Sequence, residues 1–71
     1  MPKLPVVRPK EMVKFLQKRQ FAIRKTKSGH IVMIHPDGRR TTVPIHNKTL
    51  ARGTLHGIFK QTKISPEEFN K

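Results

Sequence analysis

Apolar residues recur along this chain with two different spacings, and the spacings predict its elements. In residues 10–19 and 51–62, apolar side chains stand at i, i+3 and i+4, which is the spacing of one face of an α-helix. These positions are Met12, Phe15 and Leu16 in the first segment and Leu55, Ile58 and Phe59 in the second. The pattern therefore predicts two short amphipathic helices. Gly53–Thr54 is an alternative start for the second helix, because threonine is a favourable cap.

Three segments between the predicted helices are typical of strands. They are residues 21–26, which alternate imperfectly, residues 30–35, which hold the most hydrophobic run of the chain, and residues 40–43. Lys27–Ser28–Gly29 predicts the first turn and Pro36–Asp37–Gly38–Arg39 the second, because proline and glycine suit the dihedral angles of tight turns. Strands joined by such short turns form an antiparallel meander.

The residue patterns at the two ends of the chain predict less regular structure. Three prolines in residues 1–9 predict an extended arm, with Pro9 in the first turn of the helix that follows. In residues 65–71, Ser65–Pro66–Glu67–Glu68 is typical of a helix start and predicts a last short turn. We therefore expect one domain over residues 1–71, an α+β fold in which two helices cover one face of a three-stranded antiparallel sheet.

The charge of the chain narrows its function. Sixteen Lys and Arg against four Asp and Glu give a net charge of +12 on 71 residues, with a pI near 11.5. Such an excess predicts a polyanionic partner, with nucleic acid first, an acidic protein second and a membrane surface third. The chain has no cysteine and no apolar run near the roughly 20 residues that span a bilayer. We expect a soluble cytoplasmic protein.

The basic residues lie where they can follow a phosphate backbone. The candidate RNA-binding residues, in turns, strand ends and the approach to the second helix, are Arg24, Lys25, Lys27, Ser28, Gly29, Arg39, Arg40, Lys48 and Arg52. All four phenylalanines fall on apolar patterns and are interpreted as core. The chain therefore lacks aromatic side chains to stack on bases, which argues against sequence reading by stacking.

His30 is the candidate catalytic residue. An imidazole titrates near neutral pH and can exchange a proton with an RNA 2′-hydroxyl or a leaving oxygen, while nearby cations stabilise the phosphate. No carboxylate pair or convergent ligand set is indicated, so we expect no metal and no cofactor. The alternative is that His30 is only a polar residue at a strand end. His35 is interpreted as structural, and His46 as either an RNA contact or inert.

The strand that follows His30 leaves a question of orientation. His30 shares a face with Val32 and Ile34, whereas Ile31 and Met33 share the other. We expect Ile31 and Met33 to pack on the helices, which leaves His30 on the open face. In the opposite case, His30 is accessible only because it stands at the end of the strand beside Gly29.

The order of motifs resembles the HicA (YcfA-like) toxin family. The motifs that carry the resemblance, from Met12 to Phe69, are Lys27–Ser28–Gly29–His30, His35–Pro36–Asp37–Gly38–Arg39, Thr42–Val43–Pro44–Ile45–His46, Gly53–Thr54–Leu55, Ile58–Phe59–Lys60–Gln61 and Ser65–Pro66–Glu67–Glu68–Phe69. The chain departs from many members in having Ser28–Gly29 where Gly-Ser or Gly-Gly is usual, and Ile31 where a second histidine is common.

The resemblance implies a fold like a double-stranded RNA-binding domain. It also implies a toxin that cleaves mRNA independently of the ribosome, a HicB antitoxin as partner, and a catalytic histidine that maps onto His30. We therefore expect a metal-independent endoribonuclease of a toxin–antitoxin system. The alternatives are a non-catalytic RNA-binding module of the same fold and a small basic protein that binds an acidic protein.

Overall fold

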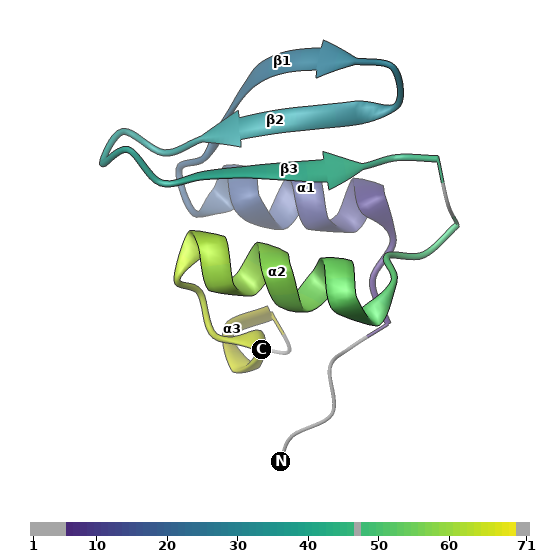
Figure 1. Ribbon diagram of the computed structural model, residues 1–71. Helices are drawn as coiled ribbons and strands as arrows, with labels where there is room; N and C mark the ends of the chain where they lie inside the picture. Colours follow the sequence, from purple (N-terminus) through teal and green to yellow (C-terminus); the bar gives the residue numbers. More distant parts are fainter. Residues whose placement is uncertain (1–5, 47, 70–71) are drawn as a thin grey trace.

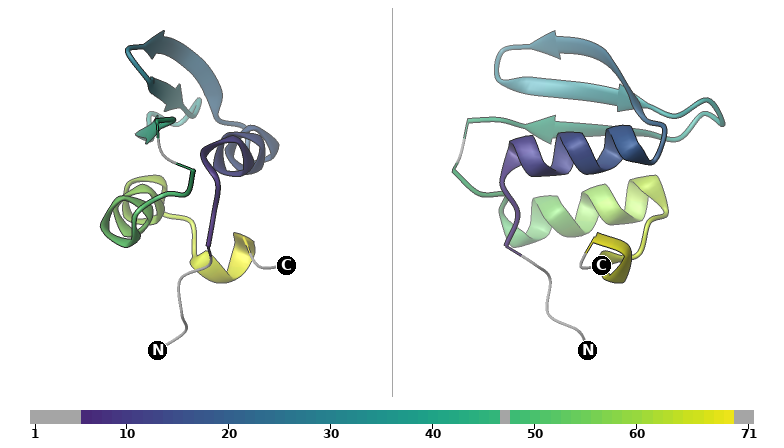
Figure 2. Two further views of the ribbon diagram at one scale, coloured as in Figure 1. Left: turned by 90° about the vertical axis from the view of Figure 1, so that its right-hand side faces the viewer. Right: turned by 180° about the vertical axis from the view of Figure 1, so that it is seen from behind.

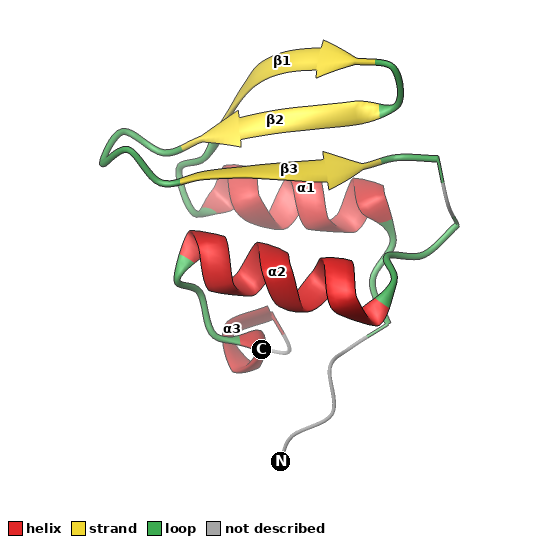
Figure 3. Ribbon diagram, viewed as in Figure 1, coloured by secondary structure: helices red, strands yellow, loops and turns green. Residues whose placement is uncertain are grey.

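A computed structural model describes residues 6–46 and 48–69 of the chain (Figure 1). Its elements are helix α1 (Pro9–Lys18), strands β1 (Ala22–Lys27), β2 (His30–Ile34) and β3 (Arg40–Pro44), and helices α2 (Arg52–Thr62) and α3 (Pro66–Phe69). This order confirms the predicted α-β-β-β-α fold (Figure 3), which is consistent with a double-stranded RNA-binding domain. In the described ranges, no helix is long and apolar enough to cross a membrane.

The three strands form an antiparallel sheet in the order β1-β2-β3. Lys27 pairs with His30, so that the two-residue turn Ser28–Gly29 closes the first hairpin. Both turn residues have positive φ, 44° and 80°, as a type I′ turn requires. The register of β1 against β2 shifts between Ile23 and Lys25. A bulge at this point explains why the polar–apolar alternation of this strand is imperfect.

Helices α1 and α2 lie side by side and pack against one face of the sheet, with α2 chiefly under β3 (Figure 2). Met33 and Val43 are fully buried in the core that they share with the helices, and Ile31 packs partly against it. The expected orientation of β2 is therefore confirmed. His30, Val32 and Ile34 lie on the face that no helix covers.

The N-terminal arm contributes more to the core than its prolines indicate. Val7 is fully buried, and its carbonyl accepts a hydrogen bond from the Leu50 backbone N–H at 2.8 Å. The arm is thereby fixed to the segment that precedes α2. Residues 1–5 of the predicted arm lie outside the described residues. Pro9 is the first residue of α1, as predicted.

The alternative start of the second helix at Thr54 is wrong. Helix α2 begins at Arg52, and the Leu55 N–H already donates to the Ala51 carbonyl at 2.8 Å. The first helical turn therefore closes before Thr54 can act as a cap.

Helix α3 confirms the predicted start signal. The Ser65 Oγ accepts from the Glu67 N–H at 3.2 Å, and Glu68 Oε2 accepts from the Ser65 N–H at 3.1 Å. This reciprocal pair caps the helix in the manner of a capping box, with the hydroxyl bonded to the second rather than the third helical N–H. The ring of Phe69 packs edge-to-face on Phe15, with ring centres 4.9 Å apart. Both rings are only partly buried, so they border the core rather than fill it.

Candidate active site

One end of the molecule gathers the start of β2, the end of β3 and the first turns of α1 and α2 (Figure 1). The antiparallel register causes this, because His30 at the start of β2 pairs with Pro44 at the end of β3. We call this region the histidine end, defined by the turn Lys27–His30, the loop residues Ile45 and His46, and the starts of the two helices. It faces the viewer in the left panel of Figure 2.

Two histidines converge at the histidine end. The rings of His30 and His46 are 5.9 Å apart between centres, at 82° to each other. Nδ1 of His30 lies 3.2 Å and Nε2 of His46 3.1 Å from the carbonyl oxygen of Ser28. A carbonyl oxygen only accepts, so both nitrogens carry the proton. In the neutral rings, Nε2 of His30 and Nδ1 of His46 therefore keep their lone pairs, and both side chains are exposed.

Gly29 makes this arrangement possible in two ways. Its φ of +80° is strained for any residue with a side chain, and a Cβ at this position would lie 1.9 Å from Nε2 of His46. Its carbonyl accepts from the Ile45 N–H at 2.7 Å, which fixes the loop that carries His46. The turn and the loop are therefore held against each other through a glycine.

Four of the predicted RNA-binding cations lie near the histidine end. Lys27 pairs with His30 and Lys25 with Val32, so both lie on the open face beside the histidine. Lys48 follows the His46 loop, and Arg52 is the first residue of α2. All four side chains are exposed. The starts of α1 and α2 add the positive ends of two helix dipoles to the same region.

The other three predicted cations lie elsewhere. Arg24 is at the bulge of β1, next to Ile34 and His35. Arg40 pairs with Ile34 at the far end of β2, about 13 Å from His30 at ~3.3 Å per residue. Arg39 is engaged in the second turn. A role of these arginines in RNA binding stays a prediction.

Arg39 and His35 organise the second turn. The Arg39 side chain pairs with Asp37 Oδ2 at 2.7 Å, donates to the Thr62 carbonyl and lies over the Phe21 ring. The Asp37 N–H donates to Nδ1 of His35 at 3.0 Å. The Arg39 backbone N–H, which donates to Asp37 Oδ1, lowers the pKa of Asp37, and the guanidinium acts in the same direction.

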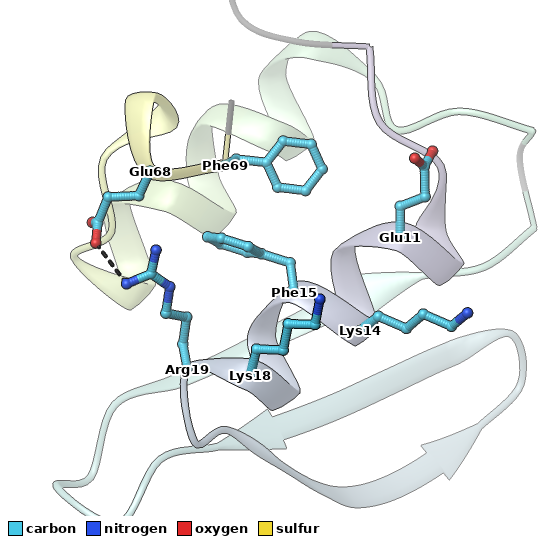
Figure 4. Close-up of a pocket in the computed structure, with 7 residues that line it drawn as sticks. All are labelled: Glu11, Lys14, Phe15, Lys18, Arg19, Glu68 and Phe69. Carbon is cyan, nitrogen blue, oxygen red and sulfur yellow. Dashed lines mark ion pairs between the residues drawn. The ribbon is translucent and has the colours of Figure 1, made fainter. Parts of the chain in front are cut away.

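Two grooves on the surface bear on where a ligand could bind. One of about 390 Å³ adjoins the histidine end and has an apolar floor with a basic rim, lined by Arg8, Pro9, Lys10, Ile31, Ile45 and Lys48. The other, of about 580 Å³, lies between α1 and α3 (Figure 4). There Phe15 and Phe69 point toward each other, and Arg19 pairs with Glu68 at 3.0 Å. This second groove contains no histidine. Over residues 6–46 and 48–69, no three His, Asp or Glu side chains cluster as metal ligands would.

Fold, charge and site together define a small basic α+β domain with an exposed pair of imidazoles. Residues 9–64 match the profile of the family described as "HicA toxin of bacterial toxin-antitoxin". The match covers most of the 71 residues, so the chain belongs to the HicA toxin family. It is accordingly a toxin of a toxin–antitoxin system, whose partner is a cognate antitoxin. A comparison with curated proteins found no match.

The proximity of His46 to His30 is the feature that sequence reasoning missed. The pairing of the second and third predicted strands could have indicated that His30 and His46 lie at the same end of the sheet. The predicted third strand, residues 40–43, ends three residues before His46, at the end of the sheet where His30 begins the second strand.

Proposed function

We propose that this toxin is an endoribonuclease that cleaves mRNA independently of the ribosome, with His30 as a general acid or base. The observation that supports this best is the placement of His30. Its ring is exposed on the open face, oriented by the Ser28 carbonyl, and stands among lysines that can bind phosphate. A ring fixed in one tautomer presents a defined nitrogen to a substrate.

The reaction that suits this site uses the RNA's own 2′-hydroxyl as nucleophile. A base removes its proton, the 2′-oxygen bonds to phosphorus, the P–O5′ bond breaks, and an acid protonates the departing 5′-oxygen. The products are a 2′,3′-cyclic phosphate and a 5′-hydroxyl end. Lys25, Lys27 and Lys48 are suited to hold the phosphate and to stabilise the charge that develops on it.

Replacing His30 tests the proposal. We expect His30→Ala to lower the cleavage rate of a purified mRNA by at least about 100-fold, because positioned acid–base groups contribute 10²–10⁴-fold. The variant should also lose the growth arrest that the toxin causes in a bacterial host. His56→Ala is the matched control, since His56 is exposed on α2. Cleavage that persists in His30→Ala would falsify the assignment.

A non-catalytic RNA-binding module is the second candidate. Ile31 stands where many family members have a second histidine next to the first, and this departure favours the non-catalytic module. Such a module is expected to bind RNA without cleaving it, with affinity that falls steeply as salt rises. Wild-type protein that binds but does not cleave, at any pH between 5 and 9, would establish this second reading.

A further inference from the structure

We infer that His46 is a second acid–base residue of this site, and that His30 and His46 divide the two proton transfers of RNA cleavage between them. The inference rests on the proposed function. The two rings come from separate segments of the chain and converge on the carbonyl oxygen of Ser28.

The reaction itself requires two groups. In-line displacement places the attacking and departing oxygens on opposite sides of phosphorus. A single imidazole that takes a proton from the 2′-oxygen is therefore on the wrong side to give one to the 5′-oxygen. Rings whose centres are 5.9 Å apart can both reach one phosphate group through hydrogen bonds of roughly 2.6–3.2 Å.

The surroundings of His46 distinguish it from the other histidines. Its ring is packed against the one turn residue that has no side chain, Gly29, and its tautomer is set by the Ser28 carbonyl. His35, by contrast, is bound within the second turn, and His56 lies exposed on α2. Of the four histidines, only His46 is placed to share a substrate with His30.

The charges around the pair are almost all positive. Lys27 is the partner of His30 on the neighbouring strand, and Lys48 follows the loop that carries His46. Arg8 and Lys10, at the start of α1, line the adjoining groove. Glu11, in the first turn of α1, accepts the Arg8 backbone N–H as a helix cap. Such a field favours a bound phosphate between the two rings.

The proposed step couples two proton transfers. One neutral ring accepts the proton of the 2′-hydroxyl, while the other, protonated ring gives a proton to the departing 5′-oxygen. One P–O bond forms and one breaks, no electron is exchanged with an outside reagent, and the two rings end with their protonation states exchanged. The rate should therefore need one neutral and one protonated imidazole, which gives a bell-shaped pH profile.

Paired substitutions separate chemistry from positioning. His46→Gln keeps an N–H where Nε2 donates to Ser28, and His30→Asn does the same for Nδ1, but neither amide transfers protons. We expect His46→Ala and His46→Gln both to lose at least about 100-fold in kcat with little change in KM. Each should also lose one limb of the pH profile. His56→Ala is the control, and thermal melting checks that each variant is folded.

A chemically altered substrate assigns the roles. In an RNA with sulfur in place of the bridging 5′-oxygen, the departing thiolate needs no acid. We expect this substrate to restore cleavage in one of His30→Ala and His46→Ala but not in the other. The restored variant lacks the acid, and the other lacks the base.

The outcomes separate the inference from the proposed function. Wild type that fails to cleave defeats both. If His30→Ala is inactive while His46→Ala or His46→Gln cleaves like wild type, the function stands and the inference is wrong. Sulfur substitution that restores both variants, or neither, also overturns the division of roles.

Discussion

Gly29 is the residue on which the geometry of the histidine end depends most directly. A side chain there meets two separate obstacles, a backbone with φ of +80° and the ring of His46. Gly38 has a similar φ of +98° but nothing within 4 Å of an added Cβ. The two glycines therefore allow backbone strain to be separated from displacement of the histidine.

We expect Gly29→Ala and Gly38→Ala each to lower the free energy of unfolding by about 1–2 kcal/mol, because L-residues resist positive φ. Only Gly29→Ala should also lower RNA cleavage, since its methyl group forces the His46 ring off the Ser28 carbonyl. Denaturant titration measures the first effect and a cleavage assay the second. Equal activity of the two folded variants would show that the position of the ring does not matter.

At the scale of elements, the β2–β3 turn joins the sheet to α2. Arg39 pairs with Asp37 in the turn, donates to the Thr62 carbonyl at the end of α2, and covers the Phe21 ring. In β3, the Thr41 hydroxyl donates to Gln61 of the same helix at 2.8 Å. An element predicted only as a turn therefore holds two layers together.

This turn should make stability depend on pH. The pKa of Asp37 is lowered below its ordinary value of 3.8, chiefly by the Arg39 backbone N–H. A lowered folded-state pKa stabilises the fold at pH values above the unfolded pKa, and the contribution is lost as pH falls through the folded one. Asp37→Asn should therefore have a lower Tm than wild type at pH 7, and the difference should shrink toward pH 2.

Glu67→Gln controls for the change in net charge. Glu67 is exposed in α3, and its carboxylate pairs with no cation in the described part of the chain. Melting curves of the three proteins from pH 2 to pH 7 make the comparison. A Tm difference between Asp37→Asn and wild type that persists unchanged at pH 2 would contradict an ionic origin.

The elements were predictable because their signals are local. Helical spacing, β-branched runs and turn residues act over a few neighbours, and they predicted every helix and strand and the inward face of β2. Contacts between distant segments were not predictable in this way. Val7 is buried in the core and accepts a backbone hydrogen bond from Leu50. His46 lies beside His30 because of the register of β3 against β2. His30 was therefore proposed from sequence alone, whereas its proximity to His46 was not predicted.

At the scale of the whole molecule, the cations behind the net charge of +12 differ in what surrounds them. The histidine end combines exposed lysines, the starts of two helices and the groove rimmed by Arg8, Lys10 and Lys48. At the opposite end, Arg19 and Arg39 are engaged in ion pairs with Glu68 and Asp37. The histidine end therefore places exposed cations beside the imidazoles, while other exposed cations, such as Lys60 and Lys63, lie elsewhere on the molecule.

Two double variants of equal net charge test whether this arrangement matters. Lys27→Gln/Lys48→Gln removes two cations from the histidine end, and Lys60→Gln/Lys63→Gln removes two exposed cations at the other end of α2. Each phosphate contact contributes about 0.7 to the slope of log affinity against log salt for single strands, so the first pair should lower that slope by about 1.4. The second pair should leave it nearly unchanged. Titrations of single-stranded RNA from 50 to 200 mM salt distinguish them, and equal slopes would mean that the RNA senses only the total charge.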